Sequence, residues 1–242
     1  MITSRQNSLV KEIRSLKDKK NRYALGKYIA EGIKTVNEAI ATNQKILCIV
    51  GTPECLARVN TDGYRTEEVT SDVFSSMSEE VSPQGVLAVI ELKKVAPNPP
   101  TQSCLFLDGV SDPSNVGAII RTAVASGYKD VYLANCADPY NGKAVRASMS
   151  GIFRVNAHIG SREELSAIID YPVVIADMNG ENVFDAKIHG DFCLVIGNEA
   201  NGVSGFMRER ASKTVKIPME NGMESLNAAV SAGILMYALK SK

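Results

Sequence analysis

The segment "DPSNVGAIIRTA" (Asp112–Ala123, the first motif) decides the fold class, together with "VIGNEANGVS" (Val195–Ser204, the second motif) and "IPMENGMESLNAAVS" (Ile217–Ser231, the third motif). Each motif joins the end of an apolar, strand-like run to a polar, glycine-containing turn, and each turn opens a helical pattern. An open parallel sheet binds its ligands outside the carboxyl ends of its strands. The three motifs therefore predict one composite site at the edge of such a sheet.

Strand-like and helix-like segments alternate around these motifs. The short apolar runs predict strands over residues 104–110, 130–135, 154–159, 172–178, 192–198 and 214–218. The segments between and after them predict helices over residues 114–127, 142–151, 162–170, 203–211 and 225–242. This alternation favours an α/β domain whose mostly parallel sheet is covered on both faces.

A proline-rich segment, "KKVAPNPPTQ" (residues 93–102), separates this domain from a smaller one and is interpreted as a linker. Residues 1–92 then form a small α/β domain, and residues 103–242 form the domain with the three motifs. In the small domain, Leu9, Ile13 and Leu16 recur at helical spacing. Further helices are predicted over residues 31–42 and 71–78, and buried strands over residues 45–52 and 85–92.

The composition is that of a globular protein, with 45% hydrophobic residues and a formal net charge of zero. No apolar run reaches the roughly 20 residues that span a bilayer, and the N-terminus has no apolar core of the secretory kind, so we expect a cytoplasmic protein with no membrane partner. Five cysteines without a CxxC pair, and only two histidines, argue against a zinc site or a disulfide scaffold. Cys104 and Cys193 lie in strand-like runs and are predicted to be core residues.

Charge is unevenly distributed along the chain. Residues 1–22 carry seven basic residues against two acidic ones. Such a stretch is either a solvated helix face or an electrostatic patch for phosphates. The candidates for RNA contact are Arg14, Lys17, Lys19 and Lys20.

In the first motif, Ser114 or Asn115 can cap the helix that follows, and Gly117 allows close approach of another backbone or a ligand. Arg121 lies six residues after Asn115, close to two helical turns, so we expect both side chains to face one edge. Arginine suits a phosphate or ribose because of its planar fork of donors. The simpler alternative is an ordinary capped helix with a surface arginine.

In the second motif, Gly197 and Gly202 bracket Glu199 in what reads as a tight turn between a strand and a helix. A carboxylate at the edge of a sheet needs a partner, and Arg121 is the candidate that we expect. An ordinary turn without function is the alternative.

In the third motif, Pro218 ends the strand, and Ser225 is predicted to cap the last helix with Asn227 in its first turn. Met219 and Met223 offer apolar walls for a ligand. A plain connection between strand and helix remains the alternative. The dinucleotide fingerprint GxGxxG and the phosphate loop GxxxxGK[ST] are both absent from the sequence, so a nucleotide-like ligand would bind here by another geometry.

The order N-x-G-x(3)-R, then G-x-E-x(2)-G-x-S, then I-P-M…S-L-N closely resembles the SpoU/TrmH-type RNA 2′-O-ribose methyltransferases of the SPOUT superfamily. The resemblance covers roughly Ser103 to the C-terminus, and "YIAEGIKTVNEAI" and "VSPQGVLAVI" resemble the substrate-binding domain of that family. It implies a deep trefoil knot in the C-terminal domain, an RNA-binding N-terminal domain and a homodimer formed through the knotted domain.

The resemblance also implies a site and a cofactor. S-adenosylmethionine would lie in a pocket made by the second and third motifs, against Gly197, Ile217 and Leu226, with Ile196, Pro218, Met219 and Ala176 beside it. Arg121 would serve the target ribose, with Asn115, Glu199, Ser225 and Asn227 around it. No metal is implied. One departure is "SLNAAVSAGIL" where many relatives have "SLNVSVA", and we expect helix packing to adjust to it.

The expected activity is therefore S-adenosylmethionine-dependent 2′-O-methylation of a ribose in RNA. The additional N-terminal domain favours rRNA as the substrate. Three alternatives remain at this stage: methylation of tRNA, a catalytically silent RNA-binding or ribosome-assembly protein on the same scaffold, and an enzyme of small-molecule metabolism with a nucleotide-binding domain.

Overall fold

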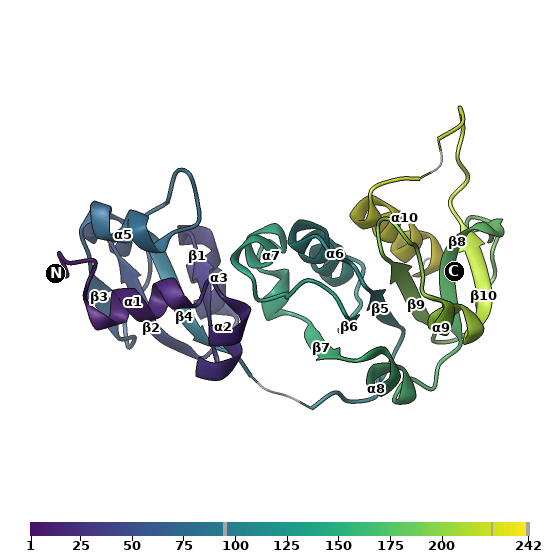
Figure 1. Ribbon diagram of the computed structural model, residues 1–242, viewed down its shortest axis with the longest axis horizontal. Helices are drawn as coiled ribbons and strands as arrows, with labels where there is room; N and C mark the ends of the chain where they lie inside the picture. The colour runs from purple at the N-terminus through teal and green to yellow at the C-terminus, as the bar shows by residue number, and fades with distance from the viewer. Residues whose placement is uncertain (94–95, 224, 241–242) are drawn as a thin grey trace. The chain divides into compact units, whose positions relative to one another are not determined.

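The computed structural model describes residues 1–93, 96–223 and 225–240 (Figure 1). Contacts divide the chain into two compact units. Unit 1 comprises Met1–Lys94 and Tyr140–Phe153, and unit 2 comprises Val95–Pro139 and Arg154–Lys242. This grouping places residues 140–153 with the N-terminal part, where the sequence had suggested a single domain over residues 103–242. The boundaries given above stay a prediction, and Lys94 and Val95 of the linker lie outside the described residues.

Unit 1 is built on a four-stranded sheet with the order β1-β4-β2-β3. The strand β4 (Val86–Glu91) runs antiparallel to both β1 (Lys27–Glu31) and β2 (Ile46–Gly51), and β2 runs parallel to β3 (Thr66–Glu68). The strands β2 and β4 match the predicted runs. The strands β1 and β3 were not predicted, since their sequences alternate too little to separate them from the neighbouring loops.

The helices of unit 1 are α1 (Ser8–Ser15), α2 (Lys19–Leu25), α3 (Ile33–Ala41), α4 (Pro53–Leu56), α5 (Ser71–Met77) and α7 (Gly142–Ala147), followed by a 3-10 turn at Gly151–Phe153. The core contains Val10 and Ile13 from α1, Leu16 just after it, and Phe74 and Met77 from α5. Asn7 caps α1, because its Oδ1 accepts the backbone N–H of Leu9 at 2.9 Å.

Unit 2 contains the six-stranded sheet β10-β8-β9-β5-β6-β7. Every neighbouring pair among these described strands is parallel. The bounds are β5 Cys104–Asp108, β6 Asp130–Ala134, β7 Asn156–Gly160, β8 Val173–Asn182, β9 Cys193–Gly197 and β10 Ala211–Lys216. All six strands were predicted from their apolar runs, and the α/β class with a parallel sheet is confirmed. Cys104 and Cys193 are fully buried neighbours in this sheet, as expected.

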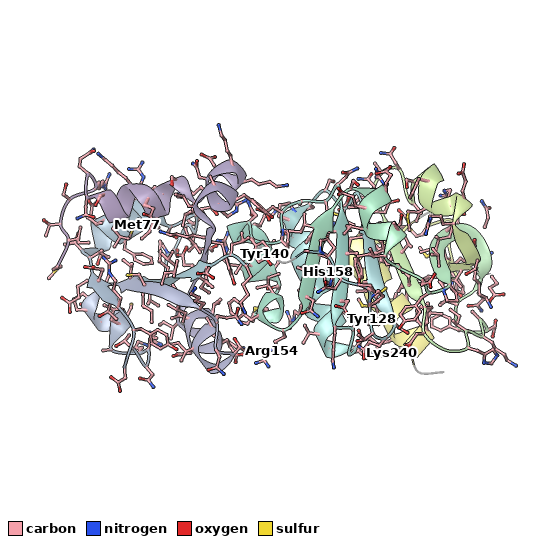
Figure 2. The ribbon with its side chains drawn as sticks, turned by 90° about the horizontal axis from the view of Figure 1, so that it is seen from below. Met77, Tyr128, Tyr140, Arg154, His158 and Lys240 are labelled. Carbon is pink, nitrogen blue, oxygen red and sulfur yellow. The ribbon has the colours of Figure 1, made fainter. Side chains whose placement is uncertain are left out.

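The helices of unit 2 are α6 (Pro113–Ala125), α8 (Arg162–Ala167), α9 (Gly205–Glu209) and α10 (Ala228–Lys240). The last helix, α10, follows β10 in the sequence but packs against α6 and β9. Its end is fixed by Lys240, whose Nζ lies 4.6 Å from the centroid of the Tyr128 ring and donates to the carbonyl oxygen of Gly127 at 2.7 Å (Figure 2).

A polar cluster around the buried Asp130 and His158 lies near the amino ends of β6 and β7. Oδ1 of Asp130, the first residue of β6, lies 2.9 Å from Nδ2 of Asn156 and 3.1 Å from Nε2 of His158. The His158 ring is stacked on Tyr132, with centroids 4.6 Å apart. Because parallel strands share their direction, this cluster lies at the opposite edge from the carboxyl ends that carry the motifs.

The direction in which successive strands are added to the sheet reverses between β5 and β9. From β5 the chain proceeds outward to β6 and β7, and it then returns to place β8 and β9 on the other side of β5. Such a switch point leaves room for a ligand outside the carboxyl ends of the two central strands. Within the described ranges, no helix is both long and apolar enough to cross a membrane.

Candidate active site

The first two motifs begin where two neighbouring strands, β5 and β9, end at the same level of the sheet. Asp108, the last residue of β5, is paired in register with Gly197, the last residue of β9. The turns that follow both strands therefore begin side by side at the switch point. This is the edge at which the sequence predicted a composite site.

The helix of the first motif begins one residue earlier than predicted. Asp112 is its N-cap and accepts the backbone N–H of Ser114 at 2.8 Å, while Pro113 occupies the first helical position. The prediction that Ser114 or Asn115 caps this helix is wrong. Proline suits the first position because its fixed φ is helical and its missing N–H is not needed there. Asn115 is thereby released from capping and can make contacts outside its own helix.

The carboxylate of Glu199 reaches across to the first motif. Its Oε1 accepts from Nδ2 of Asn115 at 2.8 Å, and its Oε2 accepts both the backbone N–H and the hydroxyl of Ser111 at 3.1 Å. The backbone N–H of Asp112 lies 3.4 Å from Oε1. The expectation that Arg121 would be the partner of Glu199 is therefore wrong. Neutral donors at the start of α6 satisfy this carboxylate instead.

These donors also affect the ionisation of Glu199. Burial alone would raise its pKa, but the hydrogen bonds from Asn115, from Ser111 and from the backbone outweigh that effect, so the pKa lies below its ordinary value. Glu199 is consequently a carboxylate at neutral pH. An ionised group with these fixed donors is suited to orienting its neighbours and poorly suited to taking up a proton.

Asn227 brings the third motif to the same cluster. Its Nδ2 donates to Oδ1 of Asn115 at 3.0 Å, while its Oδ1 accepts from the backbone N–H groups of Ala229 and Val230. Asn227 is thus the cap of α10, and the prediction that Ser225 caps this helix is wrong. Ser225 is exposed in the connection before α10. Glu224, next to it, lies outside the described residues.

Glu199, Asn115 and Asn227 consequently form a continuous hydrogen-bonded chain, with one residue from each motif. We call it the Glu199–Asn115–Asn227 chain. The sequence had assigned all three residues to the site, but not their partners. The structure brings them into direct contact across segments more than 80 positions apart.

Arg121 stands apart from this chain. Its side chain is exposed, and among the residues that the structure describes it has no hydrogen bond or ion pair. Six residues correspond to about 600° of helical rotation, which leaves Arg121 about 120° around α6 from Asn115. The two side chains therefore do not face one direction, contrary to expectation. Arg121 remains available for a ligand that approaches from another side.

The second motif forms a closed turn. The backbone of Asn198 exchanges two hydrogen bonds of 2.9 Å with Gly202, and Nδ2 of Asn198 donates to the carbonyl oxygen of Gly109 at 2.8 Å. A Cβ atom on Gly197 would lie 2.2–2.5 Å from backbone atoms of Gly202 and Val203. Glycine is required at position 197 by the turn itself, whether or not a ligand is present.

Sequence reasoning missed the buried ion pair beneath this turn. Asp108 is buried and is paired with Nε of Arg162 at the start of α8, and its Oδ2 accepts the backbone N–H of Ser204 at 2.7 Å. Ser204 in turn caps α9. A lone aspartate at the end of an apolar strand was the only signal in the sequence, and the position of Arg162 follows from the folding of unit 2.

The residues expected to hold the cofactor lie on, or directly after, three neighbouring strands, β8, β9 and β10. The β8–β9 pairing ends at Ile175 and Val195, so Ala176 and Ile196 are the next residues at that edge. Beside them, β8 bulges between Ile175 and Glu181, opposite the consecutive residues Thr214 and Val215 of β10. Ile217 follows the end of β10.

The connection between β10 and α10 carries the remaining predicted cofactor residues, and it extends away from the rest of unit 2 in Figure 1. Pro218 is exposed, and the side chains of Met219, Met223 and Leu226 are 36%, 61% and 38% exposed. Such apolar exposure in a single loop is typical of a surface that a ligand or partner covers. The strand prediction over residues 214–218 extended too far, because β10 ends at Lys216.

The basic N-terminal segment is only partly available for binding. Arg22 is buried and donates from Nη1 to the carbonyl oxygens of Leu16 and Lys17 at 2.7 Å, and Arg5 is paired with Asp72. Arg14, Lys19 and Lys20, in contrast, are exposed, which fits both an RNA contact and a solvated helix face.

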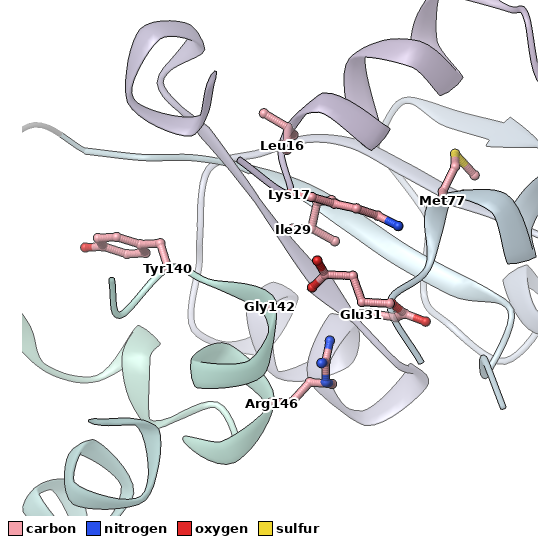
Figure 3. A pocket seen from close by; sticks show the side chains of 9 residues that line it. Leu16, Lys17, Ile29, Glu31, Met77, Tyr140, Gly142 and Arg146 are labelled. Carbon is pink, nitrogen blue, oxygen red and sulfur yellow. The ribbon is translucent and has the colours of Figure 1, made fainter. Parts of the chain in front are cut away.

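Lys17 lines a small pocket of unit 1, together with Ile29, Glu31, Met77 and Arg146 (Figure 3). Its Nζ donates to the carbonyl oxygen of Ser78 at 3.0 Å. Ser78 also donates its hydroxyl to Glu31 at 2.5 Å, and burial raises the pKa of that glutamate. Lys17 therefore already has an internal partner, which weakens its assignment as an RNA contact.

Comparison with known proteins identifies the class. The SpoU rRNA methylase family matches residues 102–237, and an MRM3-like substrate binding domain matches residues 7–88. The chain belongs to the SpoU rRNA methylase family.

Several relatives match almost the whole chain. The 23S rRNA (guanosine(2553)-2′-O)-methyltransferase RlmP of Bacillus subtilis is 30% identical, over 99% of this chain and 98% of that protein. The 23S rRNA (uridine(2479)-2′-O)-methyltransferase of Streptomyces viridochromogenes is 29% identical, over 98% and 90%. An AdoMet-bound rRNA methyltransferase structure from Sinorhizobium meliloti superposes with a TM-score of 0.86 at 29% identity, covering 98% of this chain and 95% of that one.

Proposed function

We propose that this protein is an S-adenosylmethionine-dependent methyltransferase that methylates a ribose 2′-hydroxyl in rRNA. The observation that carries this proposal is the Glu199–Asn115–Asn227 chain, which joins all three motifs at the switch point of the parallel sheet. Two relatives that match almost the whole chain, from Bacillus subtilis and Streptomyces viridochromogenes, are named 23S rRNA 2′-O-methyltransferases, and they support the choice of reaction and substrate.

The residues at this edge fit S-adenosylmethionine. Ala176 lies at the bulge of β8, Ile196 and Gly197 end β9, and Ile217 follows β10, so all four are at one edge of the sheet. The exposed apolar side chains of the β10–α10 connection can cover the ligand. We assign the cofactor to this site, with Pro218, Met219 and Leu226 as its covering wall. When bound, the cofactor supplies a methyl group that its sulfonium already activates for transfer.

Arg121 orients the acceptor ribose in this proposal. It is exposed and has no partner among the described residues, so its planar fork of donors is available for a ribose or phosphate oxygen. The pKa of arginine exceeds about 12, so a neutral arginine that could act as a base is scarce. We therefore assign orientation and charge stabilisation to Arg121, while a phosphate or a water molecule accepts the hydroxyl proton.

Asn115, Glu199, Ser225 and Asn227 complete the acceptor site. Glu199 accepts a hydrogen bond from Asn115, and Asn115 accepts one from Asn227, the cap of α10. The three motifs are therefore fixed relative to one another before substrate arrives. A preorganised arrangement of this kind lowers the cost of aligning the reacting groups.

The remaining parts of the proposal concern architecture. Residues 1–92 would bind RNA, and residues 103–242 would carry the chemistry. We also propose that the C-terminal domain is knotted and forms a homodimer, as the family resemblance implies. The packing of α10 against α6 and β9, after the chain has left β10, is consistent with a threaded C-terminus. An rRNA substrate would place the protein in the cytoplasm.

The test is methyl transfer in vitro. Purified protein is incubated with S-adenosylmethionine carrying a labelled methyl group and with unmodified transcripts of 23S rRNA, 16S rRNA and tRNA. We expect label in 23S rRNA, released as a 2′-O-methylnucleoside after digestion. Label in tRNA alone would show that tRNA, and not rRNA, is the substrate. The absence of label in all three RNAs would contradict the proposed activity. Binding of S-adenosylmethionine, measured by calorimetry, tests the cofactor separately.

A further inference from the structure

A second pocket of unit 1 is lined by Ile33, Lys34, Arg58 and Gln84. These residues are contributed by three separate segments. Ile33 and Lys34 begin α3, Arg58 follows α4, and Gln84 precedes β4. The pocket is open on one side, and none of its lining residues is acidic.

The sheet explains why the three segments meet. Glu31, at the end of β1, is paired with Leu87, and Gly51, at the end of β2, is paired with Val86. The carboxyl ends of β1 and β2 therefore flank the start of β4. Gly32 and Gly85 turn the chain at this edge with φ values of +105° and +79°, a conformation that other residues adopt only with strain.

The two cations of this pocket are not neutralised within the protein. Among the described residues, neither the Lys34 ammonium nor the Arg58 guanidinium has an ion pair or a hydrogen bond. Five other cations of unit 1 are paired with carboxylates: Arg5 with Asp72, Lys27 with Glu12, Lys45 with Glu91, Arg65 with Glu67 and Arg146 with Glu80. Arg14, Lys19 and Lys20 have no ion pair among the described residues either, but they lie on the basic segment and not in a pocket. Two unpaired cations in one pocket create a local positive potential that favours an anion.

Gln84 adds oriented donors to this pocket. Its Oε1 accepts the backbone N–H of Ile33 at 3.1 Å, so that N–H group is already used and is not available to a ligand. The same hydrogen bond fixes the amide plane of Gln84, whose nitrogen has no partner among the described residues. The pocket thus combines two cations and an amide donor, a set suited to phosphate oxygens together with a neighbouring ribose hydroxyl.

We infer that this pocket binds the sugar–phosphate backbone of the RNA substrate, with Lys34 and Arg58 on phosphates and Gln84 on an adjacent ribose or phosphate oxygen. The inference rests on the proposed function for the identity of the RNA. It adds a named contact site in unit 1, separate from the basic segment of residues 1–22. Side chains that contact the backbone contribute affinity and position, and they do not read the sequence.

The test compares the variant Lys34→Gln/Arg58→Gln with the wild type. Binding to an unmodified 23S rRNA transcript is measured by filter binding over a series of KCl concentrations. Each lost phosphate contact removes about 0.7–0.9 from the slope of log affinity against log salt, so the double variant should lose about 1.4–1.8 and bind roughly tenfold or more weakly. Gln84→Ala should weaken binding without changing the slope, because it removes no charge.

Two controls separate this effect from general loss of charge or fold. Lys129→Gln/Lys187→Gln makes the same change in net charge at exposed positions of unit 2, and it should retain most of the slope. Lys34→Arg/Arg58→Lys keeps both charges and should retain the wild-type slope. Affinity for S-adenosylmethionine should stay unchanged in every variant, and the melting temperature should stay unchanged in the charge variants, since the substituted side chains are exposed. Gln84→Ala also removes the acceptor of the Ile33 N–H at the start of α3, so its melting temperature should fall slightly.

An unchanged slope and affinity in Lys34→Gln/Arg58→Gln would overturn the inference, as would an equal loss in the Lys129→Gln/Lys187→Gln control. Failure of the proposed function has a different signature. The wild type would then transfer no methyl group to rRNA, whatever the salt dependence of its RNA binding.

Discussion

Nδ2 of Asn115, in the first turn of α6, donates to the carboxylate of Glu199 at 2.8 Å and so connects two motifs 84 positions apart in the sequence. Because the other end of the Asn115 amide accepts from Asn227, the amide is fixed in orientation from both sides. The alignment of the site therefore depends on hydrogen bonds between the motifs.

Glu199→Gln should reduce methyl transfer by up to about 100-fold, because the motif loops lose their alignment. The folded-state pKa of Glu199 is lowered from 4.5, so its carboxylate stabilises the loop above that pH, and this stability is lost only as pH falls through the lower folded value. The pH profile of kcat/KM between pH 6 and 9 should therefore have the same shape in variant and wild type. A wild-type titration in that range that disappears in the variant would instead make Glu199 a proton acceptor.

Arg121→Ala should reduce methyl transfer by about 10²–10³-fold, the cost typical of removing one fixed donor to a reacting group. S-adenosylmethionine affinity and melting temperature should remain close to those of the wild type, since Arg121 is exposed and unpaired among the described residues. Arg121→Lys should also be poorly active, because an ammonium group cannot reproduce a bidentate fork. Calorimetry with S-adenosylmethionine provides the check, and equal loss of cofactor binding would move Arg121 into the cofactor site.

Asn227 has two roles that two variants can separate. Asn227→Ala removes both the cap of α10 and the contact with Asn115, and it should cost about 1 kcal/mol of unfolding free energy as well as activity. Asn227→Ser retains a capping oxygen but is too short to reach Asn115, so it should lose activity at nearly wild-type stability. Urea denaturation and methyl transfer measured on both proteins test the distinction. Full activity in Asn227→Ser would show that the contact with Asn115 is dispensable.

The sequence predicted the parts of this molecule that depend on local pattern. The six parallel strands of unit 2 were predicted because each is a short apolar run bounded by turns. The sequence also assigned Asn115, Glu199 and Asn227 to one site, because polar residues after buried strands stand out, and the structure places these three in contact. Their hydrogen-bond partners were not predicted, since contacts over 80 or more positions depend on strand order, which periodicity does not encode. The predicted starts of α6 and α10 were wrong for a related reason. Asp112 and Asn227 each have polar neighbours that would cap a helix equally well in isolation.

Gly197→Val should lose S-adenosylmethionine binding, but the structure changes the reason that the sequence suggested. A Cβ atom at position 197 would meet the backbone of Gly202 and Val203, so even Gly197→Ala should cost about 1–3 kcal/mol of stability as the turn opens. Gly205→Ala is the matched control: no atom lies within 4 Å of its added Cβ, at the first position of α9. Thermal unfolding and cofactor calorimetry on both variants test this, and a Gly197→Ala protein with wild-type stability would contradict the described turn.

The basic N-terminal segment provides the last prediction. Lys19 and Lys20 are exposed at the start of α2, whereas Lys17 is bonded to the carbonyl oxygen of Ser78. Neutralising Lys17, Lys19 and Lys20 together should weaken RNA binding and flatten its salt dependence, and the exposed pair should account for most of the change. Lys19→Gln/Lys20→Gln should therefore reproduce the slope of the triple variant, with about 0.7–0.9 lost for each phosphate contact. Lys17→Gln alone should leave the slope unchanged and lower the melting temperature, because the Ser78 carbonyl loses its donor.

Filter binding of RNA measured over a series of KCl concentrations tests this prediction, with S-adenosylmethionine affinity as the control. A triple variant with the wild-type slope would make this segment a solvated helix face and leave RNA binding to other surfaces of the chain.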